Sequence, residues 1–254
     1  MTERMGLLSV NGGRARFTPR TLRAELRPAA RRLAAVAVGF AGGWAVLYGA
    51  LMPFGLGFVL GFAEDCFAPC AAGAALGMLL HSFGALSLRS ICLLCALGAA
   101  VAVRWMGAKK LAVTALAGCG TLVGVALCFA LGGNGGAELV FYSAADALLA
   151  AAMGLCLRRF APEQPGAGML LVGAAVAAAL GSVQLWKLWP GVAVCAALEL
   201  YLCCKGQAKA ALAACAVLGA ALCGADPAFA PAAAGLSCAT AAAAVTLFLW
   251  WTTT

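Results

Sequence analysis

Four long stretches of the chain contain no Asp, Glu, Lys or Arg, and they limit what it can fold into. They are residues 33–63, 111–137, 164–186 and 227–254. Each reaches or exceeds the roughly 20 residues that a helix needs to cross the hydrocarbon core of a bilayer. The whole chain is 65% hydrophobic and 10% charged, with a mean hydropathy of +1.00, whereas a soluble domain carries about 25% charged residues. The sequence therefore predicts an all-α, polytopic membrane bundle.

The first 32 residues form a distinct basic region. They contain eight arginines and two glutamates, and so carry most of the chain's net charge of +8. A nucleic-acid-binding arm is one interpretation, but charges that abut a first span are typical of a topology signal and also bind anionic lipid headgroups. We therefore expect a cytoplasmic tail over 1–32, a transmembrane domain over 33–251 and a truncated cytoplasmic end over 252–254. No nucleic-acid partner is expected.

Short basic loops predict the topology of the spans. If every basic loop is cytoplasmic, eight apolar segments cross the cell membrane, and both termini of this multi-pass protein lie in the cytoplasm. The expected spans are 33–51, 89–104, 111–131, 138–157, 167–185, 188–204, 208–224 and 228–250. The residues that set this topology are Arg31, Arg32, Lys109, Lys110, Arg158, Arg159, Lys205 and Lys209.

Residues 53–83 must cross an even number of times in this scheme, and they are too few for two spans of normal length. We expect two short helices, about 54–63 and 70–82, broken at "EDCFAP", because Pro69 removes a backbone donor. Whether this pair spans twice or is re-entrant is left open, since a re-entrant break must line protein or water. With the eight spans, the pair gives about ten membrane helices. The residues assigned to the break are Pro53, Gly55 and Pro69.

Four acidic residues are candidate sites, because ionisable groups at membrane depth are costly and often functional. Glu64 and Asp65 lie at the predicted break, either as an ion or substrate site or simply as a solvated pair. Asp146 lies in the middle of a span, where a structural hydrogen-bonding role competes with a proton- or ligand-binding role. Glu199 lies about one turn from a basic loop, and a pair with Lys205 is its structural interpretation.

No motif indicates a metal site, a cofactor or an enzymatic reaction. Most of the thirteen cysteines lie in apolar runs, where Cys behaves as a small hydrophobe, and "CLLC" at 92–95 has no second pair to complete a zinc site. His81 is the single histidine, and no nucleophile–base pair is evident. Abundant Gly and Ala permit close small-xxx-small packing, but such patterns arise by chance in this composition and specify no partner. We expect no catalytic residue in this chain, and we expect self-association in the bilayer.

Three segments resemble the N-terminal membrane region of the stage II sporulation protein E family. "LYGALMPFGLGFVLGF" at 47–62 is similar to the segment after the first span of that region, where an apolar helix leads into a Pro-Phe-Gly turn. "AALGMLL" at 74–80 and "AADALLAAAMGLCLRRF" at 144–160 follow in the expected order. The overall plan is also similar, with a basic N-terminus and about ten short spans, so the resemblance covers most of the chain.

The resemblance implies a membrane anchor that localises and oligomerises a cytoplasmic effector. In that family, the effector is a metal-dependent serine/threonine phosphatase domain that acts on an anti-anti-sigma factor during endospore formation, at the division septum and with a tubulin-like division protein. This chain ends at "FLWWTTT" with no such domain, so no catalytic residue is carried over. The alternative function is a small-solute transporter, or the substrate-binding membrane subunit of a vitamin importer, for which broken helices and carboxylates at mid-membrane are typical.

Overall fold

The computed structural model describes residues 19–83, 86–159, 165–181, 183, 189–204, 208–231, 233–235, 238, 239 and 242. Within them the chain is all-α, as predicted, and a single bridge between Leu47 and Leu51 is the one strand-like pairing. Some predicted features lie outside the described residues: residues 1–18 of the tail predicted over 1–32, Lys205, and the C-terminal end over 252–254. The side chains of Arg159 and Lys209 are also outside them. The helices are α1 (Pro19–Trp44), α2 (Pro53–Gly61), α3 (Glu64–His81), α4 (Leu88–Trp105), α5 (Leu111–Leu131), α6 (Ala137–Arg159), α7 (Pro165–Gly181), α8 (Pro190–Cys204), α9 (Ala208–Ala225) and the short 3-10 turn η1 (Pro227–Phe229).

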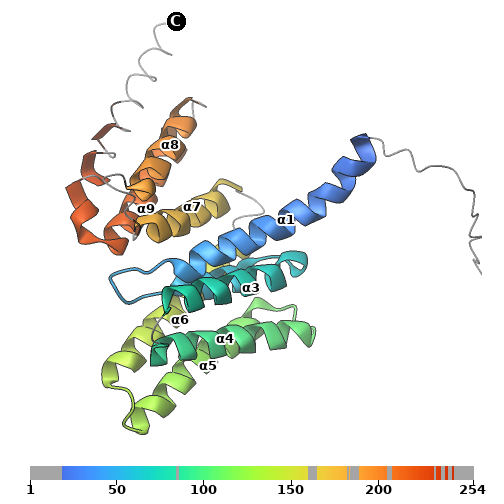
Figure 1. The fold of residues 1–254 in the computed structure, drawn as a ribbon, viewed down its shortest axis with the longest axis vertical. Coiled ribbons are helices and arrows are strands. Elements are labelled where there is room, and N and C mark those ends of the chain that lie inside the picture. The colour runs from blue at the N-terminus through green and yellow to red at the C-terminus, as the bar shows by residue number, and fades with distance from the viewer. Residues whose placement is uncertain are drawn as a thin grey trace, which may run out of the picture.

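The helices form two groups (Figure 1). Helices α1 to α6 pack together. Helix α1 packs along α3, and α5 packs against both α4 and α6, which contact each other little. Helices α7, α8 and α9 pack on one another, and α7 joins this second group to α1 and α6. The short helix α2 contacts α1, α3, α4, α5 and α6. It is therefore the centre of the first group.

Three described helices are long and apolar enough to cross a membrane, namely Leu88–Trp105, Leu111–Leu131 and Ala137–Arg158. Leu170–Gly181, Pro190–Cys204 and Ala211–Ala225 are apolar but shorter. Large apolar side chains cover the outside of the long helices, as at Leu131, which is 81% exposed. Ten membrane helices thus remain a prediction.

Helix α1 differs from the expected start of the transmembrane domain. A tail over 1–32 and a separate span over 33–51 were predicted, whereas one helix begins at Pro19, runs through Pro28 and ends at Trp44. The chain then turns back through Tyr48 and Gly49, which have positive φ angles of 52° and 67°. Gly tolerates this conformation without steric cost, whereas Tyr does not. The Tyr48 N–H donates to the carbonyl of Gly224 in α9, which ties this turn to the second helix group.

Helices α1 and α3 approach until their backbones touch. A side chain at Gly39 would collide with the carbonyl of Cys70, and one at Gly43 with that of Ala74. In α3, Gly73 and Gly77 meet carbonyls of α1 in the same way. Both helices therefore carry a Gly-xxx-Gly face, the arrangement that permits the closest helix packing. These four glycines permit the close packing of two helices of the same chain.

Residues 53–83 form two helices rather than one, which confirms the prediction of a break. The position of the break differs from the predicted one. Helix α2 ends at Gly61, and α3 begins at Glu64 and runs unbroken through Pro69. The assignment of Pro69 as a helix break is wrong. Pro69 lies near the start of α3 and leaves only the carbonyl of Asp65 without its intrahelical donor, while Glu64 and Asp65 favour a helix N-terminus because of its positive partial charge. Pro53 is the first residue of α2, where Pro fits well, and Gly55 lies inside α2.

Candidate functional site

Helix α2 is unusual because it is buried along almost its whole length. Pro53–Leu60 are all buried, and Leu56, Phe58, Val59 and Leu60 have no exposed surface. Nine residues extend only about 14 Å, less than half of a bilayer core. The beginning of α2 is buried and its end is half-buried, so the backbone groups at both ends need partners from the protein.

The N-terminal end of α2 meets a buried carboxylate. Asp146 of α6 is 1% exposed, and its Oδ1 accepts a hydrogen bond from the Met52 N–H at 2.8 Å. Its Oδ2 accepts from Arg89 Nη2 at 2.6 Å, and the Arg89 side chain is 15% exposed. The guanidinium of Arg89 also lies 5.0 Å from the centre of the Tyr142 ring. The carboxylate thus satisfies a backbone donor and places negative charge at the positive end of the α2 dipole.

The C-terminal end of α2 meets a cation. Arg104, which is nearly buried at the end of α4, donates from Nη1 to the Val59 carbonyl and from Nη2 to the Phe62 carbonyl, both at 2.8 Å. Its guanidinium lies 4.6 Å from the centre of the Phe67 ring. A cation at this end complements the negative partial charge of the last carbonyls. Helix α2 is therefore closed by opposite charges at its two ends.

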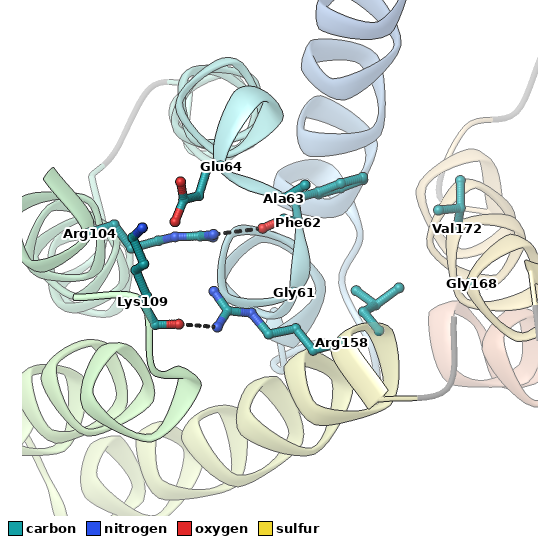
Figure 2. A pocket seen from close by; sticks show the side chains of 10 residues that line it. Gly61, Phe62, Ala63, Glu64, Arg104, Lys109, Arg158, Gly168 and Val172 are labelled. Carbon is teal, nitrogen blue, oxygen red and sulfur yellow. Dashed lines mark hydrogen bonds between the residues drawn. The ribbon is translucent and has the colours of Figure 1, made fainter. Parts of the chain in front are cut away.

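A cavity of about 590 Å³ opens beside the C-terminal end of α2. Figure 2 shows Arg104 from α4, Lys109 from the loop before α5 and Arg158 from α6 around the turn between α2 and α3, where Glu64 also lies. Arg158 Nη1 donates to the Lys109 carbonyl at 3.0 Å. All these groups come from helix ends, so the cavity lies at one end of the first helix group. We name it the end pocket, and it is lined by Gly61, Phe62, Ala63, Glu64, Arg104, Lys109, Leu157, Arg158, Gly168 and Val172.

The structure separates the four acidic candidates. Glu64 and Asp65 are exposed in the first turn of α3, and Glu64 lines the end pocket. Asp146 lies at the other end of α2, in its ion pair with Arg89. Glu199 is buried in α8, which packs against α7 and α9 in the second group, and its predicted partner Lys205 is outside the described residues.

The residues that were predicted to set the topology also lie at different places in the structure. Arg31 and Arg32 are exposed on α1, and Lys110 is exposed beside Lys109. Lys109 and Arg158, which were predicted only as loop charges, come together at the end pocket.

Sequence reasoning missed Arg89 and underestimated Arg104. Arg89 is the only Asp, Glu, Lys or Arg between Asp65 and Arg104 in the sequence. It lies at an end of a span that was expected to face outward, where the positive-inside rule disfavours Arg. That misplaced charge was a usable signal that Arg89 pairs with a carboxylate inside the protein. Arg104 is the last residue of the expected span 89–104, and its hydrogen bonds to the end of α2 were not foreseen.

Comparisons of the chain with protein-family models, with curated proteins and with solved structures found no match. In the described residues, no three His, Cys, Asp or Glu side chains are close enough to hold a metal ion. The structural argument about function therefore begins from the arrangement of charges around α2.

Proposed function

We propose that this chain is a multi-pass membrane anchor that holds a cytoplasmic effector in place and assembles with further copies in the bilayer. One observation carries the proposal: both carboxylate oxygens of Asp146 are engaged by protein groups, the Met52 N–H and Arg89. A carboxylate that binds an ion or solute must be accessible to it, whereas Asp146 is 1% exposed. Asp146 instead holds together α2, α4 and α6, which is what a rigid anchor requires.

The surface and the charge distribution support membrane insertion. Leu116 and Leu148 are 76% and 73% exposed on α5 and α6, in keeping with helix faces that meet lipid. Arg104, Lys109 and Arg158 lie at one end of the first helix group, whereas the uncharged turn "GGNGG" at 132–136 joins the opposite ends of α5 and α6. This asymmetry supports a cytoplasmic location for the end pocket, and with it cytoplasmic termini.

The resemblance to the stage II sporulation protein E family suggests what the anchor holds. By that resemblance, the effector is a serine/threonine phosphatase of sporulation, and the place is the division septum. This part of the proposal rests only on the sequence segments that carry the resemblance.

Transport of a small solute is the second candidate, and one observation favours it. Transporters use interrupted helices whose ends lie inside the membrane and whose dipoles face a substrate, and α2 is a short helix of which Pro53–Leu60 are buried. In this protein, however, the ends of α2 face Asp146 and Arg104.

A double substitution separates the two functions. Asp146→Asn combined with Arg89→Gln removes both charges together, so no buried charge is left unpaired. Fused to a fluorescent reporter in an endospore former, the anchor with both changes should still label the division septum. Uniform membrane label for the unchanged chain, together with solute binding that the double substitution abolishes, would replace the anchor with the transporter.

A further inference from the structure

The end pocket holds more positive than negative charge at short range. Arg104 and Arg158 are close enough to repel each other electrostatically, and Glu64 attracts both. Lys109 adds a third cation. The salt bridge among the described residues joins Arg89 and Asp146, at the other end of α2. None of the three cations of the end pocket forms a close ion pair with Glu64 in that part of the chain. Three cations and one carboxylate around one cavity leave an unneutralised positive site.

Not all of this charge is used by the fold. Arg104 closes the end of α2 with both terminal nitrogens, so its role is structural. Within the described part of the chain, Arg158 makes one hydrogen bond, from Nη1 to the Lys109 carbonyl. The other nitrogens of its guanidinium and the ammonium of Lys109 can therefore donate to a ligand. Arg and Lys are the residues that bind phosphate, Arg through paired donors and Lys as a point charge.

The shape of the end pocket suits a group with a charged head and an apolar body. Phe62, Leu157 and Val172 contribute apolar side chains to the lining of the same cavity. Its volume, about 590 Å³, is within the roughly 300–1,000 Å³ range of small-molecule sites. Glu64 and Lys109 are exposed, so the pocket is accessible from outside the protein.

We propose that the end pocket binds a phosphate ester through Lys109 and Arg158, with Arg104 contributing charge from behind. Two sources have this chemistry: the headgroup of an anionic phospholipid, and a free phosphate compound in solution. The site does not depend on the anchor function. Loss of septal labelling with phosphate binding intact would contradict the anchor alone.

Binding is measured on the full chain purified in neutral detergent. Phosphatidylglycerol, phosphatidylcholine and sn-glycerol 3-phosphate are each titrated while the thermal unfolding midpoint is followed, because a ligand that binds the folded state raises that midpoint. We expect a saturable rise with phosphatidylglycerol or with glycerol phosphate. A rise with phosphatidylglycerol alone assigns the lipid source, and a rise with both assigns free phosphate chemistry.

Three variants, which carry four substitutions between them, test the residues. Lys109→Gln with Arg158→Gln should weaken binding at least tenfold, since each charged hydrogen bond contributes about a factor of ten or more. Lys110→Gln is the matched control, because it removes the same charge from the adjacent exposed residue, which does not line the pocket. Glu64→Gln removes the carboxylate and should tighten binding several-fold, a gain that a damaged fold would not produce.

The proposal is overturned if neither phosphatidylglycerol nor sn-glycerol 3-phosphate raises the unfolding midpoint. It is also overturned if the double variant binds as tightly as the unchanged chain, or if Lys110→Gln weakens binding as much as the double variant does. A Glu64→Gln variant that binds more weakly would likewise contradict a phosphate site.

Discussion

Asp146 and Arg89 lie at the beginning of the buried helix α2, and each compensates a charge that the other would otherwise leave in an apolar core. Removing one member of such a pair is far more destabilising than removing both, because the remaining charge keeps its desolvation cost without its partner. The pair also joins two segments that are 57 positions apart in sequence. Its contribution is therefore a matter of tertiary structure rather than of local helix propensity.

A double-mutant cycle tests this coupling. We expect Arg89→Gln alone to lower the free energy of unfolding by about 3–5 kcal/mol, and the double variant with Asp146→Asn to lower it less. The measurement is denaturant unfolding in micelles for all four proteins. Additive effects of the two substitutions would mean that Arg89 and Asp146 are not energetically linked.

The sequence was informative about the members of the site and not about their pairing. Asp146 could be identified because a lone carboxylate in an apolar helix needs a partner. The misplaced charge of Arg89 indicated a partner inside the protein, but which carboxylate it pairs with depends on the register in which α4 meets α6. The Ala- and Leu-rich sequences of these two helices set no unique register. Lys109 and Arg158 were found as a topology signal, but their meeting at one cavity follows from helix lengths that the charge pattern does not determine.

At the level of elements, the packing of α1 on α3 depends on four glycines without side chains to keep the backbones apart. Gly39 and Gly43 of α1 meet carbonyls of α3, and Gly73 and Gly77 of α3 meet carbonyls of α1. A methyl group at any of these positions cannot be accommodated by rotation of a side chain, because the obstacle is backbone. A side chain at any one of these four positions would therefore force the two helices apart.

Single Gly→Ala substitutions measure this property. Gly43→Ala and Gly73→Ala should each lower the free energy of unfolding by at least about 1–3 kcal/mol, the usual cost of overpacking. Gly120→Ala and Gly124→Ala in α5 are matched controls, because open space surrounds both positions; they should be neutral or stabilising by about 0.4–1 kcal/mol. Equal unfolding midpoints for the two sets would contradict the backbone contact.

Helices α2 and α3 show why the position of a break is harder to predict than its existence. The break was foreseen because the 31 residues of 53–83 are too few for two full spans, and that argument concerns only length. Its position was assigned to Pro69, on the expectation that proline ends a helix. In the protein, Arg104 donates to the carbonyls of Val59 and Phe62, so a side chain distant in sequence stabilises the end of α2 at this position.

For the whole molecule, the charges at helix ends predict a direction in the bilayer. The loop that contains Lys109 and Lys110 should be cytoplasmic, and the loop over 132–136 should face outward. A topology reporter inserted after Asn134, and another inserted after Gly107, should be active on opposite faces of the membrane. The same face for both insertions would exclude the proposed topology and would leave the three long helices without a consistent set of crossings.

The closure of α2 also has a consequence in time. The hydrogen bond from Met52 to Asp146 joins residues 94 positions apart, and at about 5–20 residues per second, Asp146 is synthesised roughly 5–20 s after Met52. During that interval the Met52 N–H lacks the carboxylate that accepts its hydrogen bond in the folded protein. Nascent chains that stop short of Asp146 should therefore remain bound to the insertion machinery or be degraded, whereas chains extended past Arg159 should be released and resist proteolysis.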